Sequence, residues 1–154
     1  MKRPRKVLLL GAGGMGMAPL ALYLRGAGVR VEAFDHKFRE PLRTELENAG
    51  VKILHEPEAI LTPDCVVRSS AIPADDPMVS EWVNADVPVY KRGEFLSSLF
   101  SRKRVIAVVG SHGKTSVAGR IAWALERLNF PCSYLVGAQF IDSILPSGKF
   151  QKSP

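Results

Sequence analysis

Short apolar runs alternate with amphipathic stretches along the chain, and glycine or proline marks most of the junctions between them. Apolar runs of this length, rich in valine, leucine and isoleucine, are typical of strands buried on both faces of a parallel sheet. The predicted strands are Lys6–Leu10, Val29–Phe34, Val51–Leu54, Cys65–Arg68, Pro88–Tyr90, Arg104–Val109 and Cys132–Val136.

The segments between these runs carry helix start and stop signals. Pro41 and Pro77 suit a first helical turn, Asp76 suits an N-cap, and Gly26 and Gly50 suit helix ends. The predicted helices are Met17–Arg25, Pro41–Ala49, Pro77–Asn84, Gly93–Phe100 and Lys114–Leu128. Repeated strand–helix units predict an α/β fold, a Rossmann-like parallel sheet with helices on both faces.

The strand–helix alternation starts twice, on either side of a polar break at residues 101–104. Residues 1–101 are long enough for a complete domain. Residues 102–154 offer only a strand, a loop, a helix, a strand and a polar tail, and so small a sheet cannot cover both of its faces. We therefore expect 102–154 to be the truncated beginning of a second domain, with residues 146–154 poorly ordered.

Composition and charge exclude some classes of function. Hydrophobic residues make up 46% of the chain and charged residues 23%, which fits a globular protein with a core. The net charge is +6, but the basic residues are scattered and no basic stripe is interleaved with aromatics, so we expect no nucleic-acid partner. Residues 7–24 are uncharged, yet glycines and Pro19 interrupt them, so we expect no membrane segment.

The two cysteines, Cys65 and Cys132, lie far apart in the sequence. They provide neither a disulfide framework nor the spacing of a metal site. We expect both to be buried free thiols of a cytoplasmic protein.

The first glycine loop, Gly11–Gly16, follows a predicted strand and opens a predicted helix. It satisfies G-x-G-x-x-G, and Asp35 stands at the end of the next strand. Such glycines let the backbone approach a diphosphate at a helix N-terminus, and such a carboxylate accepts hydrogen bonds from a ribose. The pattern predicts a nucleotide site without fixing the nucleotide. The alternative is a turn that only allows close helix–strand packing.

The second glycine loop, Gly110–Thr115, resembles a P-loop. Its backbone N–H groups would hold phosphates, Lys114 would reach the β- and γ-phosphates, and the Thr115 hydroxyl would hold Mg²⁺. The general pattern has a glycine where this sequence has Val108. The alternative is a Gly-Lys-Thr helix start without a ligand. We expect both loops to lie between the end of a strand and the start of a helix.

Four stretches, in this order, resemble the Mur ligase family. They are Gly11–Met17 followed by Leu20-Ala21, Val66–Ile72 followed by Asp76-Pro77, Val87–Leu96, and Ile106–Thr115. Together they span nearly the whole chain. The P-loop of that family has the short form G-[TS]-x-G-K-T, which residues 110–115 match.

The resemblance implies a three-domain, ATP-dependent ligase of peptidoglycan precursor synthesis in the bacterial cytoplasm. Its substrates would be UDP-N-acetylmuramate and L-alanine, joined through an acyl phosphate, with ATP and Mg²⁺ as cofactors. Residues 1–101 would be the UDP-sugar-binding domain and 102–154 the beginning of the central ATP-binding domain. Downstream metal ligands and the amino-acid domain of the family are missing from this sequence, so the chain alone is expected to be catalytically incomplete.

Three alternatives to this function stay open at the level of sequence. Within the family, the alternative is the ligase that recycles murein tripeptide. Outside it, the Gly11–Gly16 loop and Asp35 alone would suit a nicotinamide-dependent oxidoreductase, and the short second unit would suit a non-enzymatic nucleotide sensor.

The resemblance also implies two sets of site residues. The UDP-sugar set is Gly11, Ala12, Gly13, Gly14, Met15, Gly16, Met17, Asp35, His55, Ser69, Ser70, Ala71 and Arg92. The ATP set is Gly110, Ser111, His112, Gly113, Lys114, Thr115 and Ser116, with Lys114 and Thr115 catalytic and Thr115 on Mg²⁺. Asp35 and His55 would lie near the uridine, and the planar fork of Arg92 would meet a phosphate. The alternatives are that His55 is a plain loop histidine and that Arg92 is a solvated arginine.

Overall fold

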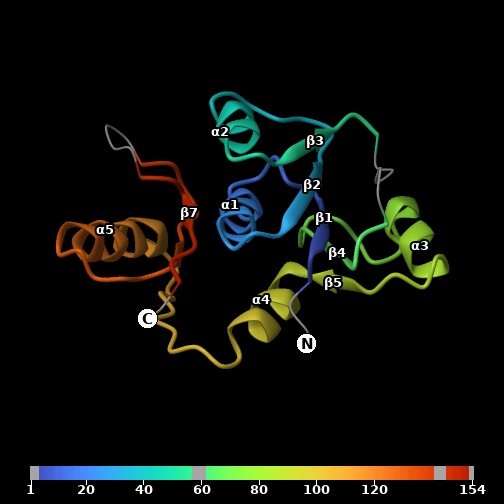
Figure 1. Cartoon of the computed structure of the whole chain (residues 1–154). Coiled ribbons are helices and arrows are strands. Elements are labelled where there is room, and N and C mark those ends of the chain that lie inside the picture. Colours follow the sequence, from blue (N-terminus) through green and yellow to red (C-terminus); the bar gives the residue numbers. More distant parts are fainter. Residues whose placement is uncertain (1–3, 57–61, 141–144, 153–154) are drawn as a thin grey trace.

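The computed structural model describes residues 4–56, 62–140 and 145–152, and its first part is a five-stranded, all-parallel sheet (Figure 1). The strand order is β3-β2-β1-β4-β5, which confirms the predicted α/β fold. The strands are β1 (Lys6–Leu10), β2 (Arg30–Phe34), β3 (Lys52–Leu54), β4 (Cys65–Arg68) and β5 (Val89–Lys91).

Helices cover both faces of the sheet, as predicted. Helices α1 (Ala18–Gly26), α2 (Leu42–Asn48) and α4 (Arg92–Phe100) pack on one face, and α3 (Pro77–Asn84) packs on the other (Figure 1). The Asp76 side chain accepts a hydrogen bond from the Met78 N–H at 3.0 Å, so the predicted N-cap is confirmed.

The central strand β1 supplies both halves of the core. Because side chains alternate along a strand, Val7 and Leu9 face the α1 side, and Leu8 and Leu10 face the α3 side. All four are buried. Each buried side chain of this size contributes about 2 kcal/mol of hydrophobic free energy, so β1 fixes the sheet from which the first glycine loop emerges.

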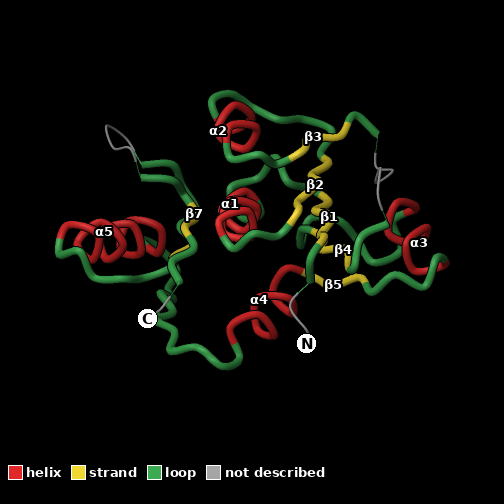
Figure 2. Tube along the Cα trace, in the orientation of Figure 1, coloured by secondary structure: helices red, strands yellow, loops and turns green. Residues whose placement is uncertain are grey.

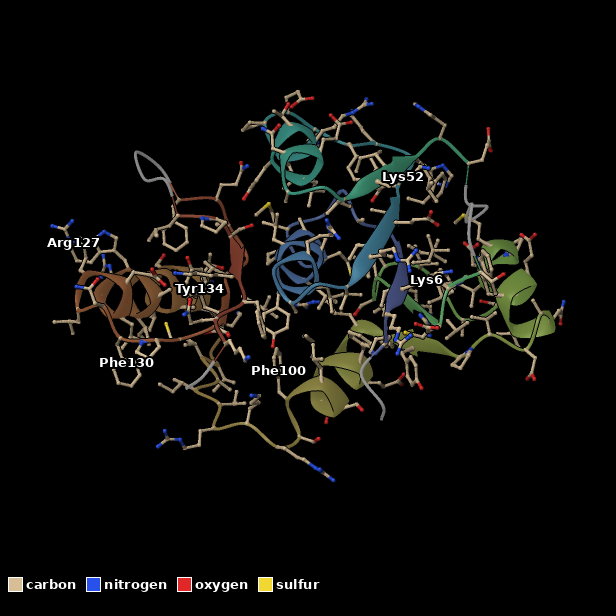
Figure 3. All side chains as sticks on the ribbon, viewed as in Figure 1. Lys6, Lys52, Phe100, Arg127, Phe130 and Tyr134 are labelled. Carbon is tan, nitrogen blue, oxygen red and sulfur yellow. The ribbon has the colours of Figure 1, made fainter. Side chains whose placement is uncertain are left out.

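The second unit contains one long helix and a small sheet. Helix α5 (Lys114–Arg127) packs beside an antiparallel pair, β6 (Tyr134–Leu135) and β7 (Gly148–Lys149). Tyr134 lies where α5 meets this pair, and burial raises the pKa of its hydroxyl to about 12 (Figure 3). Of the predicted strand Cys132–Val136, only Tyr134–Leu135 forms a strand, and it pairs in the antiparallel rather than the parallel direction.

The predicted strand Arg104–Val109 is wrong. Figure 2 shows the connection from α4 to α5 as loop, and the apolar side chains of Val105, Ile106 and Val109 are 59%, 75% and 84% exposed. A strand exists only where a neighbour satisfies its backbone hydrogen bonds. Within the described ranges no strand lies beside 104–109, so its apolar pattern has no partner.

The expectation that residues 146–154 are poorly ordered is also wrong for the segment around β7, while residues 153–154 lie outside the described residues. Ser147 and Gly148 are buried, and β7 packs against α1, beside which it lies in Figure 1. The Phe150 ring meets Tyr23 edge-on with centroids 5.4 Å apart. Contacts across the fold therefore order a segment whose own sequence is polar.

Cys65 is buried, as predicted, whereas Cys132 is only partly buried, which corrects the second half of that prediction. Burial, assisted by the neighbouring Asp64 carboxylate, raises the pKa of the Cys65 thiol to about 12. No helix in the described part of the chain is both long and apolar enough to cross a membrane.

Candidate functional site

The first glycine loop lies between β1 and α1, as predicted. The Gly11 and Ala12 N–H groups donate to the Phe34 carbonyl at 2.8 and 3.1 Å, which ties the loop to the end of β2. Gly11 has a φ of +79°, and a Cβ there would lie 2.7 Å from the Cβ of Ser69. Only glycine fits this turn, which brings the loop against the carboxyl end of β4.

Asp35 braces this loop from the end of β2. One carboxylate oxygen accepts from the Gly13 N–H at 2.8 Å, and the other accepts from the Lys37 N–H at 3.0 Å. A Cβ on Gly13 would overlap the Lys37 carbonyl oxygen. A carboxylate has about four lone-pair sites, so Asp35 can accept further hydrogen bonds while it fixes the loop. The sequence pattern indicated the ribose contact but not the brace.

Arg92 stands over the same loop. The side chain of Glu94 accepts from the Lys91 N–H at 2.9 Å, which fixes the start of α4 and with it Arg92. A Cβ on Gly16 would lie 3.7 Å from one guanidinium nitrogen of Arg92. The Arg92 Nε is buried and has no hydrogen-bond partner among the described residues. A buried, unpaired N–H is costly, and a phosphate oxygen would satisfy it, which favours the phosphate role over a solvated arginine.

Ser69, Ser70 and Ala71 follow β4 at the same edge of the sheet. The Ser69 N–H donates to the Leu10 carbonyl at 2.9 Å, and its side chain lies against Gly11. Ser70 and Ala71 are exposed. The glycine loop, Ser69 and Arg92 thus meet at the carboxyl ends of β1, β4 and β5, where open parallel sheets bind their ligands.

A surface pocket of about 360 Å³ opens at the carboxyl ends of β2 and β3. It is lined by Phe34, Asp35, His36, Lys37, Phe38, Arg43, Ile53, Leu54 and His55. The structure therefore brings Asp35 and His55 into one pocket. Since Asp35 also holds Gly13, this pocket adjoins the glycine loop.

Two predicted residues of the first site can act only through their backbones. Ala12 and Met17 are 0% and 1% exposed, and their side chains belong to the core. Their assignment as UDP-sugar-binding residues stays a prediction, and it does not involve their side chains.

The second glycine loop precedes α5 but follows no strand, so half of the expected setting is wrong. Gly113 has a φ of +73° and is the N-cap of α5. The Lys114 ammonium folds back over the loop and donates to the carbonyls of Gly110 and Ser111 at 2.6 and 3.0 Å. The first N–H groups of a helix lack intrahelical acceptors, so the end of this 14-residue helix can bind an anion.

The remaining residues of the P-loop set line its exposed surface. The His112 Nδ1 and the Ser111 hydroxyl are 3.2 Å apart, and Thr115 and Ser116 lie in the exposed first turn of α5. Thr115 would give Mg²⁺ one oxygen ligand. The described residues contain no cluster of three His, Cys, Asp or Glu side chains that could complete a metal site.

Gly137, which sequence reasoning missed, lies between the two loops. A Cβ there would lie 3.7 Å from the Thr115 hydroxyl oxygen and 3.9 Å from the Met15 carbonyl oxygen. The two loops, far apart in the sequence, therefore both come close to this residue. In the sequence, the only indication that Gly137 belongs to a site was its position directly after a predicted strand.

The sequence profile described as "Mur ligase family, catalytic domain" matches residues 6–104, which is more than half of the chain. The chain belongs to the Mur ligase family. Curated Mur ligases similar to it include the UDP-N-acetylmuramate–L-alanine ligase of Coxiella burnetii, 37% identical over 141 residues, which are 90% of this chain and 30% of that one. The Aquifex aeolicus enzyme of the same name is 36% identical over 141 residues, with 90% and 31% covered.

Solved Mur ligase structures share the fold. The chain overlays on the UDP-N-acetylmuramate–alanine ligase of Thermotoga maritima with a TM-score of 0.85 and 24% identity, over 97% of this chain and 35% of that one. A murein peptide ligase from Psychrobacter arcticus gives a TM-score of 0.82 and 26% identity, over 97% and 34%. This Mur ligase chain thus spans about a third of the length of the relatives that it matches.

Proposed function

We propose that this chain provides the UDP-sugar domain and the P-loop of an ATP-dependent ligase that joins L-alanine to UDP-N-acetylmuramate. The observation that carries the proposal is that the chain is 36–37% identical to ligases of that name over nine-tenths of its length. The closeness of both glycine loops to Gly137 is consistent with it. An enzyme that uses these substrates would work in the bacterial cytoplasm. Because the chain spans about a third of these relatives, no residue here is assigned to L-alanine.

The first loop would hold the sugar nucleotide by its diphosphate. The N–H groups of Gly14, Met15 and Gly16, just before α1, and the guanidinium of Arg92 would offer donors to the phosphate oxygens. Asp35 and His55 would face the uridine from the adjoining pocket. Rigid bracing by Asp35 lowers the entropy lost on binding, because the donors are already in place.

The second loop would hold the phosphates of ATP. The carboxylate of UDP-N-acetylmuramate is a poor electrophile, and bound ATP would supply the phosphoryl group that converts it to an acyl phosphate. The amine of L-alanine would then attack the acyl phosphate and displace phosphate. Lys114 would exchange its contacts with two loop carbonyls for phosphate oxygens. The task of the chain is then to position the reactants and to neutralise charge.

Titration calorimetry with UDP-N-acetylmuramate tests the first half of this proposal. We expect measurable binding to the wild-type chain and at least about tenfold weaker binding for Arg92→Ala, because a charge-assisted hydrogen bond is worth about 1.5–3 kcal/mol. Arg102→Ala, in the exposed connection before α5, is the matched control and should bind as the wild type does. No heat at millimolar ligand would contradict the proposal.

The oxidoreductase and sensor alternatives now have less support. A nicotinamide site would use the first loop and leave Gly110–Thr115 without a role, and the family is a ligase family. NADH fluorescence should therefore not change on mixing with the chain. Murein tripeptide ligation stays the alternative within the family, since solved murein peptide ligases share the fold.

A further inference from the structure

Gly137 occupies a position where an alanine would fit the protein itself. It is exposed, and its φ lies outside the left-handed region that favours glycine. An added Cβ would meet only the Thr115 hydroxyl oxygen and the Met15 carbonyl oxygen within 4 Å, at 3.7 and 3.9 Å. Both are ordinary van der Waals distances, so folding alone does not require glycine here.

The two atoms that flank Gly137 belong to the two different ligand loops. The Thr115 hydroxyl oxygen and the Met15 carbonyl oxygen can be no farther apart than the sum of their distances from the Cβ position of Gly137. A phosphate held by the P-loop beside Thr115 and a ligand held by the first loop beside Met15 would therefore lie close together near Gly137. The carboxylate of the sugar nucleotide must come within about 3–3.5 Å of the terminal phosphate before transfer, so the space between the two loops has to stay free of side chains.

We propose that Gly137 is a positioning residue that keeps open the point where the sugar nucleotide and the terminal phosphate of ATP meet. This inference rests on the proposed function. Its basis is steric: the position gives the two ligands access to each other, and any side chain would project into their shared space.

The backbone around Gly137 is held firmly enough for this role. Val136 is buried, and its N–H donates to the Ser147 carbonyl at 2.8 Å. Glu45 of α2 accepts from the Gln139 side chain at 2.9 Å and from the Ser147 N–H at 3.3 Å. These bonds join the segment on both sides of Gly137 to the first domain, so an added methyl cannot easily move away.

Calorimetry on the full chain tests the inference with two ligands, UDP-N-acetylmuramate and the Mg²⁺ complex of a non-hydrolysable ATP analogue. Gly137→Ala should bind each ligand alone within about twofold of the wild type. With the first ligand already bound, the second should bind Gly137→Ala at least about tenfold more weakly than it binds the wild type under the same conditions. Simple damage to the fold would instead weaken the separate affinities.

Gly119→Ala is the matched control. A Cβ on Gly119 would also make only ordinary contacts, 3.7 Å from Phe140 and 3.8 Å from Val136, and neither of these residues belongs to a glycine loop. It should bind both ligands, singly and together, as the wild type does. Unfolding of Gly137→Ala would contradict the contact distances on which the inference stands.

The outcomes separate the inference from the proposed function. If the wild type binds each ligand and Gly137→Ala binds the pair equally well, the inference is overturned and the proposed function stands. If the wild type binds neither ligand, the proposed function is overturned and the inference falls with it.

Discussion

At the scale of single residues, Asp35 shows how one side chain can serve both the fold and the site. Its carboxylate accepts from the Gly13 and Lys37 N–H groups, so it holds the glycine loop in the conformation that faces a ligand. The sequence predicted the position of Asp35 and of the loop. It could not reveal the brace, because a hydrogen bond across the loop depends on the folded backbone rather than on spacing.

Asp35→Ala should therefore lower stability and weaken UDP-N-acetylmuramate binding together. Loss of two hydrogen bonds to a partly buried carboxylate, with two N–H groups left unpaired, should cost about 1–3 kcal/mol in the free energy of unfolding. Urea denaturation measures this cost. Asp75→Ala, at an exposed position before α3, should unfold as the wild type does; equal losses in both variants would contradict the role of Asp35.

Asp64 makes the stability of the fold depend on pH. Hydrogen bonds from the Lys6 and Arg5 N–H groups lower the pKa of its carboxyl below the ordinary value of 3.8. A carboxyl whose pKa is lower in the folded state stabilises the fold above its unfolded pKa and loses that contribution as the pH falls through the folded pKa.

Asp64→Asn should consequently be less stable than the wild type at neutral pH, and the difference should shrink below about pH 4. Denaturation curves at a series of pH values measure it. A difference that stays constant from pH 7 to pH 2 would show that the charge of Asp64 contributes nothing.

At the scale of elements, the sequence predicted the five-stranded sheet and its helices well but not the second unit. Buried parallel strands are apolar along their whole length, so β1 and β4 are visible in the sequence alone. The segment 104–109 has the same apolar character and is not a strand, because strand formation also needs a neighbour. The order around β7 was invisible, since it comes from the fit of a polar segment against α1.

Gly148 is central to that fit. A Cβ there would lie 2.6 Å from the carbonyl carbon of Pro19, and the contact is with backbone that cannot rotate away. Lys149, next in β7, pairs with Glu126 of α5 at 2.7 Å. The strand β7 thus joins α5 to α1.

Gly148→Ala should release the second unit from α1 and leave the five-stranded sheet folded. Hydrogen exchange should become faster at Val136, whose N–H is bonded to Ser147, and stay slow in β1. Gly93→Ala, where a Cβ would meet nothing within 4 Å, is the control and should exchange as the wild type does. Unchanged protection at Val136 in Gly148→Ala would show that this docking tolerates a side chain.

At the scale of the whole molecule, the two glycine loops come from different parts of the chain, and an atom of each lies within 4 Å of the Cβ position of Gly137. The first loop lies where the sequence predicted, and the resemblance to Mur ligases is confirmed by the family match. Their meeting point could not be predicted, because it depends on how β6 and β7 dock on the first domain. Exposed apolar residues such as Phe130, which follows α5 and lies below it in Figure 3, show that this docking leaves part of the second unit uncovered.

Backbone amide shifts in a nuclear magnetic resonance titration test the central claim most directly, since they report which loop each ligand touches. UDP-N-acetylmuramate should shift the amides of Gly11–Gly16 and the Arg92 side chain, and Mg²⁺ with the ATP analogue should shift those of Ser111–Thr115. The Gly137 amide should respond to both ligands. If the sugar nucleotide leaves Gly11–Gly16 unshifted at saturating concentration, the account is contradicted.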